Sequence, residues 1–350
     1  MVDEDKLNAF IGKAVGDLGG AWSVPMVRLG EKLGLYRALK GAPMTTAELA
    51  AKCGVAERYA REWLSHQAAS GYLEYDPVSG KFTLPEEQAM VLADPDSPVY
   101  MLPAFDLTAT LLDAEPLIEP AFRSGKGVSW GDQPQCLFCT TGKSFRTRYQ
   151  ANLLSSWLPA LDGVVDKLER GAAVADIGCG HGFSTIIMAK AFPKSTFVGY
   201  DFHPASIEQA RVHAKEHGAS QNARFEIGLA TTFAAKDLDF VTFFDCLHDM
   251  GDPAGAARHA RQSLKPDGSL MVVEPQAGDR LEDNLNPVGR MSYAASTFVC
   301  VPTSLNQPVG AALGAQAGFA RLKSVIAEGG FGTVRKATEN PLNMVIEARI

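Results

Sequence analysis

The sequence predicts an α/β fold: an open sheet of seven strands with helices, preceded by a smaller, mainly helical domain. From Val174 onward, short apolar runs alternate with helical stretches, which is the pattern of an α/β sheet. The first of these runs leads into a loop with glycine at every second position, and a helix follows the loop. Two further strand-like runs close the chain and complete the expected seven strands.

The 350 residues suffice for one large and one smaller domain, and we expect segments at residues 1–95, 96–170 and 171–350. The net charge of −7 argues against nonspecific binding to nucleic acid or to an anionic membrane. No run of about 18 apolar residues exists, and the N-terminus has no signal-peptide pattern. We therefore expect a cytoplasmic protein without a membrane partner.

Six cysteines are spread along the chain, and we expect them to be ordinary thiols in a reducing setting. Cys136 and Cys139 form a single C-x-x-C pair. A structural zinc site needs four ligands, and the sequence has neither a second such pair nor a nearby His-x-x-x-His. The sequence therefore predicts no metal site.

Residues 1–40 predict two helices, separated by a break at Gly19 and Gly20. The first helix has apolar residues at helical spacing, namely Phe10, Ile11, Val15 and Leu18. An apolar helix at this position predicts either contact with a second copy of the chain, giving a homodimer, or packing on its own domain.

Residues 41–90 predict helix, turn, helix and hairpin, which together make a winged helix. Thr45 and Glu48 form a capping-box sequence that opens a helix, Gly54 ends it, and the next helix ends at Gly71. Two alternating runs around residues 77–80 predict the hairpin. A DNA reader needs a basic face, but this stretch has four basic and seven acidic residues, so we expect a structural or dimerising role and no nucleic-acid partner.

Residues 96–170 predict a helical linker between the domains. The apolar pattern favours a helix over residues 101–122, a loop over 125–142 and a second helix over 145–168. Because long loops between domains often act as lids or binding segments, we expect this region to cover a substrate.

Residues 174–203 predict a strand, a glycine loop, a helix and a second strand that ends in Asp201. Gly178, Gly180 and Gly182 allow positive φ and let backbone N–H groups approach a ligand closely. A dinucleotide-binding turn would have its third glycine at position 183, which is Phe183 here. The glycine spacing therefore differs from that of a dinucleotide loop.

The G-x-G-x-G loop preceded by Asp176 resembles motif I of class I S-adenosyl-L-methionine-dependent methyltransferases. The resemblance implies a Rossmann-like domain that holds the methionyl end and ribose of S-adenosyl-L-methionine against the loop. It implies that Asp201 binds the ribose hydroxyls, that Phe202 packs on adenine, and that a group near Thr231 or Thr232 faces the adenine edge. Asp176 would either meet the cationic amine or order the loop. The remaining residues expected at the cofactor site are Gly178, Cys179, Gly180, Gly182, Asp245 and Cys246.

The α/β pattern continues to the end of the chain. We expect strands at residues 223–227, 238–245 and 269–275, with Asp252 capping an intervening helix and a turn over 265–268. We expect helices at residues 203–217, 284–301 and 310–328, and a closing antiparallel hairpin, which is a further resemblance to class I methyltransferases.

His248 and Asp249 follow the fourth strand, and a winged helix before a Rossmann-like domain resembles small-molecule O-methyltransferases. In that family a His-Asp-Trp segment supplies a histidine as general base, and here Met250 replaces the tryptophan. A histidine suits this role because its pKa lies near neutrality. Asp249 or Glu274 would orient the ring, and the alternative is that His248 only ties down the turn.

The sequence thus favours an S-adenosyl-L-methionine-dependent methyltransferase acting on a small-molecule hydroxyl. The alternatives are a cofactor-sensing regulator that binds DNA through the winged helix, and an NAD-dependent oxidoreductase. Residues 97–150 and 284–310 are rich in Phe, Leu and Met, and we expect them to line a pocket for an apolar or aromatic acceptor.

Overall fold

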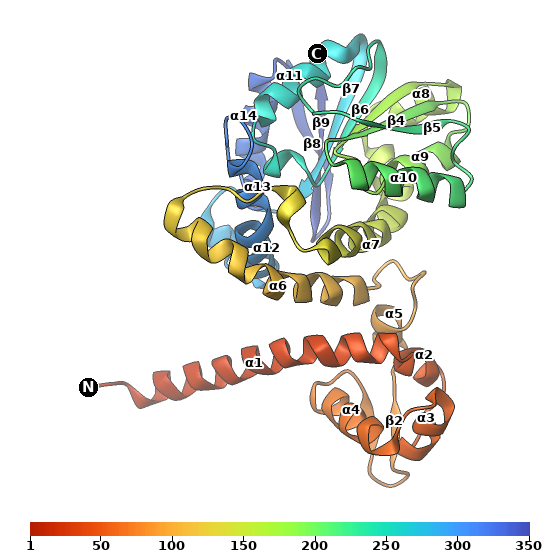
Figure 1. The fold of residues 1–350 in the computed structure, drawn as a ribbon, viewed down its shortest axis with the longest axis vertical. Helices are drawn as coiled ribbons and strands as arrows, with labels where there is room; N and C mark the ends of the chain where they lie inside the picture. The colour runs from red at the N-terminus through yellow and green to blue at the C-terminus, as the bar shows by residue number, and fades with distance from the viewer. The chain divides into compact units, whose positions relative to one another are not determined.

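The computed structural model describes all residues 1–350, which form two compact units, Met1–Thr110 and Leu111–Ile350 (Figure 1). No helix in either unit has the length and apolarity needed to cross a lipid bilayer.

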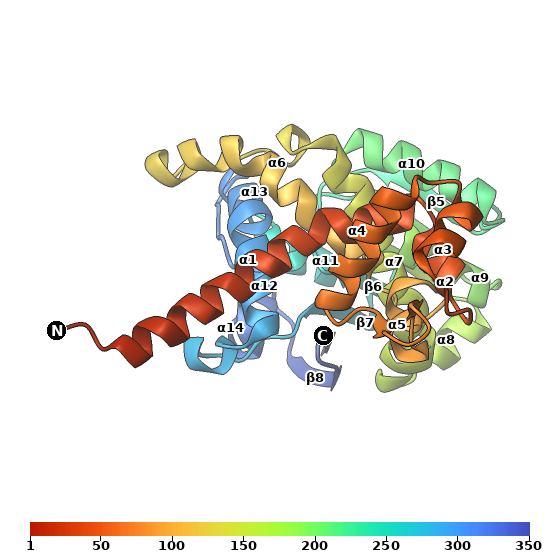
Figure 2. The same ribbon diagram turned by 90° about the horizontal axis from the view of Figure 1, so that it is seen from below.

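The N-terminal unit begins with one long helix, α1 (Glu4–Lys32), followed by the short α2 (Leu35–Leu39) (Figure 2). The predicted break at Gly19 and Gly20 is wrong, because both glycines lie inside α1. A glycine in a helix interior costs only about 1 kcal/mol relative to alanine, so it weakens a helix without ending it. The helix ends instead at Leu33, before Gly34, whose φ of 69° is left-handed.

The winged helix is confirmed. Thr45 and Glu48 form the predicted capping box at the start of α3 (Thr46–Cys53), and Gly54 ends the helix at a φ of 67°. Then come α4 (Glu57–Ala69), the antiparallel hairpin β1 (Glu74–Asp76) and β2 (Lys81–Thr83), and α5 (Glu86–Leu92). Their core is a cluster around Tyr36, Trp63 and Leu64.

Helices fill the stretch between the hairpin and the large sheet, beginning with α6 (Leu102–Ser124). The predicted loop is shorter than expected, because α7 (Gln135–Asn152) begins directly after Pro134. A proline suits the position before a first helical turn, where its missing N–H costs no hydrogen bond. The remaining elements are η1 (Trp130–Asp132), the π-helical η2 (Leu153–Trp157), η3 (Leu158–Ala160) and α8 (Val164–Arg170).

The predicted seven-stranded sheet is confirmed, with the strand order β5-β4-β3-β6-β7-β9-β8. Five strands are parallel, and β9 and β8 add to β7 as an antiparallel pair. The strands are β3 (Ala173–Ile177), β4 (Thr196–Asp201), β5 (Ala223–Ile227), β6 (Leu238–Phe244), β7 (Leu264–Pro275), β8 (Thr333–Glu339) and β9 (Asn343–Arg349). The predicted turn at residues 265–268 lies inside β7, where the pairing with β6 shifts register.

Each face of the sheet has its own core, because successive strand residues point to opposite faces. Phe240 and Phe244 of β6 belong to the core beneath α8, α9 (Phe183–Ala191) and α10 (Pro204–Glu216). Val241 and Phe243 belong to the core beneath α11 (Pro253–Ser263) and α14 (Gly318–Glu328). Figure 1 shows these two helical layers on either side of the sheet.

Two helical predictions near the C-terminus need correction. The stretch 284–301 is interrupted, because Asn286 caps a new helix, α12 (Pro287–Ala295), and η6 (Ser296–Cys300) is π-helical before α13 (Val301–Leu305). The short η5 (Leu281–Asn284) precedes them. Residues 310–317 are not helical, since Gly310, Ala312 and Gly314 have positive φ, which a right-handed helix does not allow.

Candidate functional site

The glycine loop joins β3 to α9 at the carboxyl ends of the parallel strands, where open α/β sheets bind ligands. All three glycines have positive φ: 71° at Gly178, 51° at Gly180 and 79° at Gly182. A Cβ at Gly182 would lie 2.6 Å from the Phe225 ring, and one at Gly178 would lie 2.8 Å from Cys246 Sγ. A Cβ at Gly180 would meet nothing within 4 Å, so its backbone faces open space where a ligand could lie.

Asp201 is held directly beneath this loop. Its Oδ2 accepts a hydrogen bond from the Gly180 N–H at 2.9 Å, and its Oδ1 accepts one from the His203 N–H at 2.8 Å. Burial raises the pKa of Asp201, and the two backbone hydrogen bonds offset this only in part. The carboxylate therefore has a fixed orientation, and each oxygen keeps a lone pair for a ligand.

Asp176 has a different environment from Asp201, because it is 1% exposed. It accepts hydrogen bonds from the hydroxyls of Ser184 at 2.7 Å, Thr185 at 2.6 Å and Thr242 at 2.9 Å. These bonds tie β3 to α9 and β6. Of its two predicted roles, the structure therefore favours ordering the loop over direct contact with a cofactor amine.

Asp245 lies at the end of β6 with a φ of 49°, an uncommon value for a residue other than glycine. Its Oδ1 accepts a hydrogen bond from Asn343 Nδ2 at 2.9 Å, but its Oδ2 is buried without any partner. Burial raises the pKa of Asp245 to about 7, although Arg148 opposes this rise. Buried polar atoms are nearly always paired, so an unpaired carboxylate oxygen beside a ligand site suggests a missing donor.

The side chains of Cys179 and Cys246 pack against the protein. Cys179 is buried, and a Cβ at Gly199 would lie 2.8 Å from its Sγ. Cys246 Sγ donates to the Ile177 carbonyl at 3.3 Å. Cys179 belongs to the loop and the Cys246 side chain lies against it at Gly178, whereas the Phe202 side chain is 42% exposed. Thr231 is half-buried after β5.

His248, in the 3-10 helix η4 (Leu247–Asp249) that follows β6, and Glu274, near the end of β7, form a buried pair. His248 Nδ1 lies 2.5 Å from Glu274 Oε2, and Glu274 Oε1 accepts the Leu247 N–H at 2.9 Å. Burial works against the charged ring, but the Glu274 carboxylate outweighs it and raises the pKa of His248 well above its usual range. Of the two acids predicted to orient the ring, Asp249 and Glu274, it is Glu274 that contacts Nδ1.

Comparison with known protein families identifies both units. Residues 168–319 match the model of a methyltransferase domain, and residues 21–94 match that of an Rv2258c-like winged helix-turn-helix domain. The chain contains a methyltransferase domain. The winged helix precedes it, as the sequence predicts.

Solved structures share the fold of the whole chain. A putative O-methyltransferase of Nostoc punctiforme PCC 73102 is 19% identical, with a TM-score of 0.71 over 96% of this chain and 98% of that one. Mitomycin 7-O-methyltransferase is 22% identical, with a TM-score of 0.66 over 99% and 100% of the two chains. Human N-acetylserotonin methyltransferase, solved with S-adenosylmethionine, is 17% identical, with a TM-score of 0.68 over 97% of both chains.

Curated relatives match only part of the methyltransferase chain. The ubiquinone biosynthesis O-methyltransferase of Actinobacillus pleuropneumoniae serotype 5b is 33% identical over 105 residues, which is 29% of this chain and 44% of that protein. That of Xanthomonas axonopodis pv. citri is 32% identical over 114 residues, which is 32% of this chain and 47% of that protein. The matches thus span less than half the length of these relatives.

The methyltransferase domain has a cavity of about 270 Å³ between α6 and the η6–α13 segment. Its walls are mostly apolar, with Lys126 as the charged member: Ile118, Ala121, Phe122, Lys126, Thr297, Val301, Pro302 and Leu305. These residues come from both stretches that the sequence predicts as pocket walls. Val301 directly follows Cys300 in the chain, and Cys300 Sγ lies 3.3 Å from His248 Nε2.

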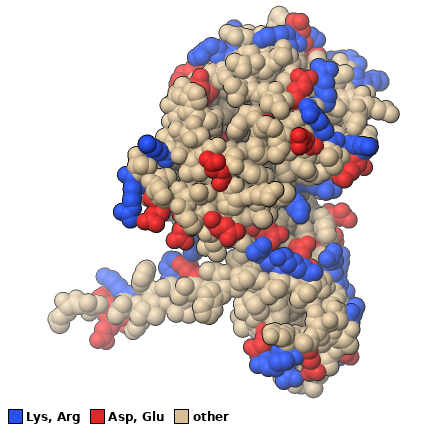
Figure 3. Space-filling view, viewed as in Figure 1, with Lys and Arg blue, Asp and Glu red and all other residues tan.

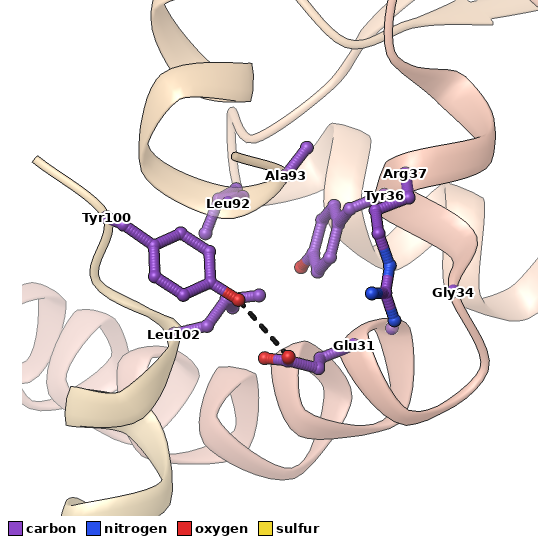
Figure 4. Close-up of a pocket in the computed structure, with 9 residues that line it drawn as sticks. Glu31, Gly34, Tyr36, Arg37, Leu92, Ala93, Tyr100 and Leu102 are labelled. Atoms are coloured by element: carbon purple, nitrogen blue, oxygen red, sulfur yellow. Dashed lines mark hydrogen bonds between the residues drawn. The ribbon is translucent and has the colours of Figure 1, made fainter. Parts of the chain in front are cut away.

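The N-terminal unit contains a second, much smaller cavity, lined by residues that include Gly30, Tyr36 and Leu92. Its small cavity of about 10 Å³ has room for about one water molecule. Tyr100 closes one side by donating a hydrogen bond to Glu31 at 3.1 Å (Figure 4). We therefore exclude this cavity as a substrate site.

The surface of the winged helix carries mixed charge. On α4, Arg61 pairs with Glu57 at 3.0 Å, and Arg58 pairs with Glu62. Basic and acidic side chains also lie among one another on the face of this unit visible in Figure 3. Such a surface offers little unpaired positive charge for phosphates.

Cys300 is the site residue that sequence reasoning missed. It lies 52 positions from His248 and belongs to no recognisable motif. Only its place at the end of the π-helical η6 brings its thiol to the histidine. The one available signal, an apolar helix after the fifth strand, does not single out this cysteine.

Proposed function

We propose that this protein is an S-adenosyl-L-methionine-dependent methyltransferase that methylates a hydroxyl of a small molecule. The observation that supports this most is the buried His248–Glu274 pair beside the glycine loop. Gly178 of the loop abuts Cys246, two residues before His248. A base and a cofactor loop therefore share one edge of the sheet.

The residues of the loop fit this cofactor. The open space at Gly180 admits a ligand close to the backbone, and Asp201 has free lone pairs for the ribose hydroxyls. The unpaired Asp245 Oδ2 would accept the cationic amine of the methionyl end, and Phe202 would cover the adenine, with Thr231 at its edge. When bound, the cofactor supplies an electrophilic methyl group on a sulfonium centre.

His248 would remove the acceptor proton. Glu274 occupies Nδ1, so Nε2 is the nitrogen left to accept a proton from a hydroxyl. The ring gains positive charge in this step, and the adjacent Glu274 carboxylate stabilises it. Glu274 thus acts as a positioning residue, whereas alignment of donor and acceptor supplies most of the remaining rate.

We infer an apolar, aromatic acceptor of modest size. An apolar cavity of about 150 Å³ already holds benzene. The cavity of about 270 Å³ between α6 and the η6–α13 segment is therefore large enough for one or two fused rings. Lys126 in its wall would favour an acceptor that also carries a negative charge.

We also propose a homodimer that forms through α1. Four apolar side chains on one face of this helix are at least half exposed: Ile11 at 50%, Val15 at 63%, Leu18 at 60% and Trp22 at 74%. Their spacing of four, three and four residues makes one continuous stripe. Such a stripe normally packs against a partner surface.

The winged helix favours a second candidate, a cofactor-sensing regulator that binds DNA. The mixed charges of α4 oppose it. Gel shifts at several salt concentrations decide between the two, because specific DNA binding with a steep salt slope would support the regulator.

The central test is a binding and turnover experiment. Calorimetry should detect S-adenosyl-L-methionine and its demethylated product but not NAD. Cofactor with a labelled methyl group should then label members of a panel of phenols and hydroxylated bicyclic aromatics. Tight NAD binding, or no binding of the methyl donor, would overturn the proposal.

A further inference from the structure

A second feature of the site concerns His248 Nε2, the nitrogen that faces away from Glu274. Nε2 lies 3.3 Å from Cys300 Sγ, and a ring nitrogen of His248, Cys300 Sγ and an Asp249 carboxylate oxygen all lie within 4.8 Å of one another. We propose that these three atoms form a binding site for a divalent cation of the zinc class. Nitrogen, thiolate and carboxylate ligands are those that zinc prefers.

The spacing of the ligands suits such an ion. Zinc binds sulfur at about 2.3 Å and imidazole nitrogen at about 2.0 Å, so a tetrahedral site holds the two roughly 3.5 Å apart. Here His248 Nε2 and Cys300 Sγ are 3.3 Å apart. Asp249 is half-buried, and its carboxylate makes no hydrogen bond or ion pair with another side chain, so it is available as the third ligand.

The environment of His248 supports the proposal independently. Histidines that bind a metal nearly always donate their second ring N–H to a carboxylate or carbonyl, which fixes the ring and its tautomer. Glu274 provides this contact at 2.5 Å, and its other oxygen is held by the Leu247 N–H. Cys300 ends the π-helical η6, and π-helical turns occur often at functional sites.

Three protein ligands leave one tetrahedral position open. A metal at this site would occupy the Nε2 lone pair that His248 needs as a base. The protein with zinc bound would therefore be unable to deprotonate the acceptor. This consequence for turnover rests on the proposed function. Binding of the metal does not.

Cobalt(II) titration of the full-length protein tests the site directly. The exposed Cys136 and Cys139 on α7 are first replaced by serine to remove a competing pair of thiols. We expect one equivalent of cobalt to give the near-ultraviolet absorption of a thiolate–cobalt bond. Cys300→Ser should abolish this band, and Asp249→Asn should weaken binding at least about tenfold. An absent band, or a band unchanged in Cys300→Ser, would overturn the proposal.

If Cys300→Ser does not fold, the site can be tested without that variant. Zinc-edge X-ray absorption is then measured on the zinc-loaded protein that lacks Cys136 and Cys139 but keeps Cys300. One sulfur ligand with nitrogen or oxygen neighbours supports the site, whereas zinc without sulfur, or with two sulfurs, contradicts it. Neither readout depends on methyl transfer. A protein that binds cobalt but transfers no methyl group would therefore disprove only the proposed function.

Discussion

Glu274 holds His248 through Nδ1 at 2.5 Å while its other carboxylate oxygen accepts the Leu247 N–H at 2.9 Å. Both oxygens are thus committed, and the carboxylate has one orientation. The histidine lies in the short 3-10 helix η4 (Leu247–Asp249), which follows β6, and the glutamate lies near the end of β7, the parallel neighbour of β6. Strand pairing therefore sets the position of the base.

His248→Ala should lower kcat by about 10²- to 10⁴-fold, because general base catalysis is worth that much. Affinity for the cofactor should change little, since the two ring nitrogens face Glu274 and Cys300 rather than the glycine loop. Steady-state kinetics and calorimetry measure the two effects. His217→Ala, at the end of α10, is the matched control and should leave both unchanged. If the His248→Ala variant turned over as fast as the native protein, His248 would not be the general base.

Glu274→Gln should move the acidic limb of the kcat/KM profile to lower pH. The Glu274 carboxylate raises the pKa of His248, so its loss lets the ring lose its proton at lower pH. The plateau rate should fall by more than about tenfold, because the developing positive charge loses its partner. Asp249→Asn should shift the limb less, since Asp249 makes no hydrogen bond to the ring. The reverse order of shifts would show that Asp249 orients His248.

Asp201→Asn should weaken cofactor binding by about 1.5 to 3 kcal/mol, the worth of hydrogen bonds to a charged group. Calorimetry with the demethylated cofactor measures the loss, and urea unfolding reports on the fold. Asp166→Asn, at an exposed position in the same domain, should change neither quantity. Unaltered affinity in the Asp201 variant would contradict the ribose assignment.

Asp245→Asn should flatten the dependence of stability on pH in the cofactor-free protein. The pKa of Asp245 is about 7 in the folded chain, compared with about 3.9 in an unfolded one. Its contribution to stability is therefore complete below about pH 4 and is lost as the pH rises to 7. Asparagine tolerates the left-handed backbone, so at pH 7 the variant should be more stable by on the order of a few kcal/mol.

Urea unfolding at pH 5 and pH 7 checks this expectation for Asp245. The same variant should bind the cofactor more weakly, because it lacks the negative charge proposed to meet the amine. Parallel pH dependences in the variant and the native protein would show that Asp245 is not the titrating group.

Leu18→Lys should dissociate the proposed dimer, since it puts a charge in the middle of the apolar stripe of α1. Sedimentation velocity should give twice the chain mass for the native protein and a dimer dissociation constant raised at least about tenfold in the variant. Lys13→Glu changes charge on the same helix at a residue that is outside the stripe, and it should leave the mass unchanged. A monomeric native protein would contradict the proposal.

The sequence by itself determined the order of the strands along the chain and the identity of the glycine loop. Strand periodicity, the capping box at Thr45 and the spacing of the three glycines are local patterns, and each was found where predicted. The helix boundaries predicted near Gly19 and over residues 310–317 were wrong. A helix continues through a glycine at a cost of only about 1 kcal/mol, whereas the positive φ angles within residues 310–317 exclude a right-handed helix.

Tertiary structure alone decided how the site is assembled. Asp245 and Asn343, or His248 and Cys300, are brought together by strand pairing and by the π-helical turn of η6, not by any spacing along the chain. Only the fold shows that Glu274 rather than Asp249 meets the ring, and that Asp176 is enclosed by hydroxyls while Asp245 keeps an unpaired oxygen. Burial and hydrogen-bond partners decide the chemistry of these carboxylates, and both depend on contacts between residues that are distant in sequence.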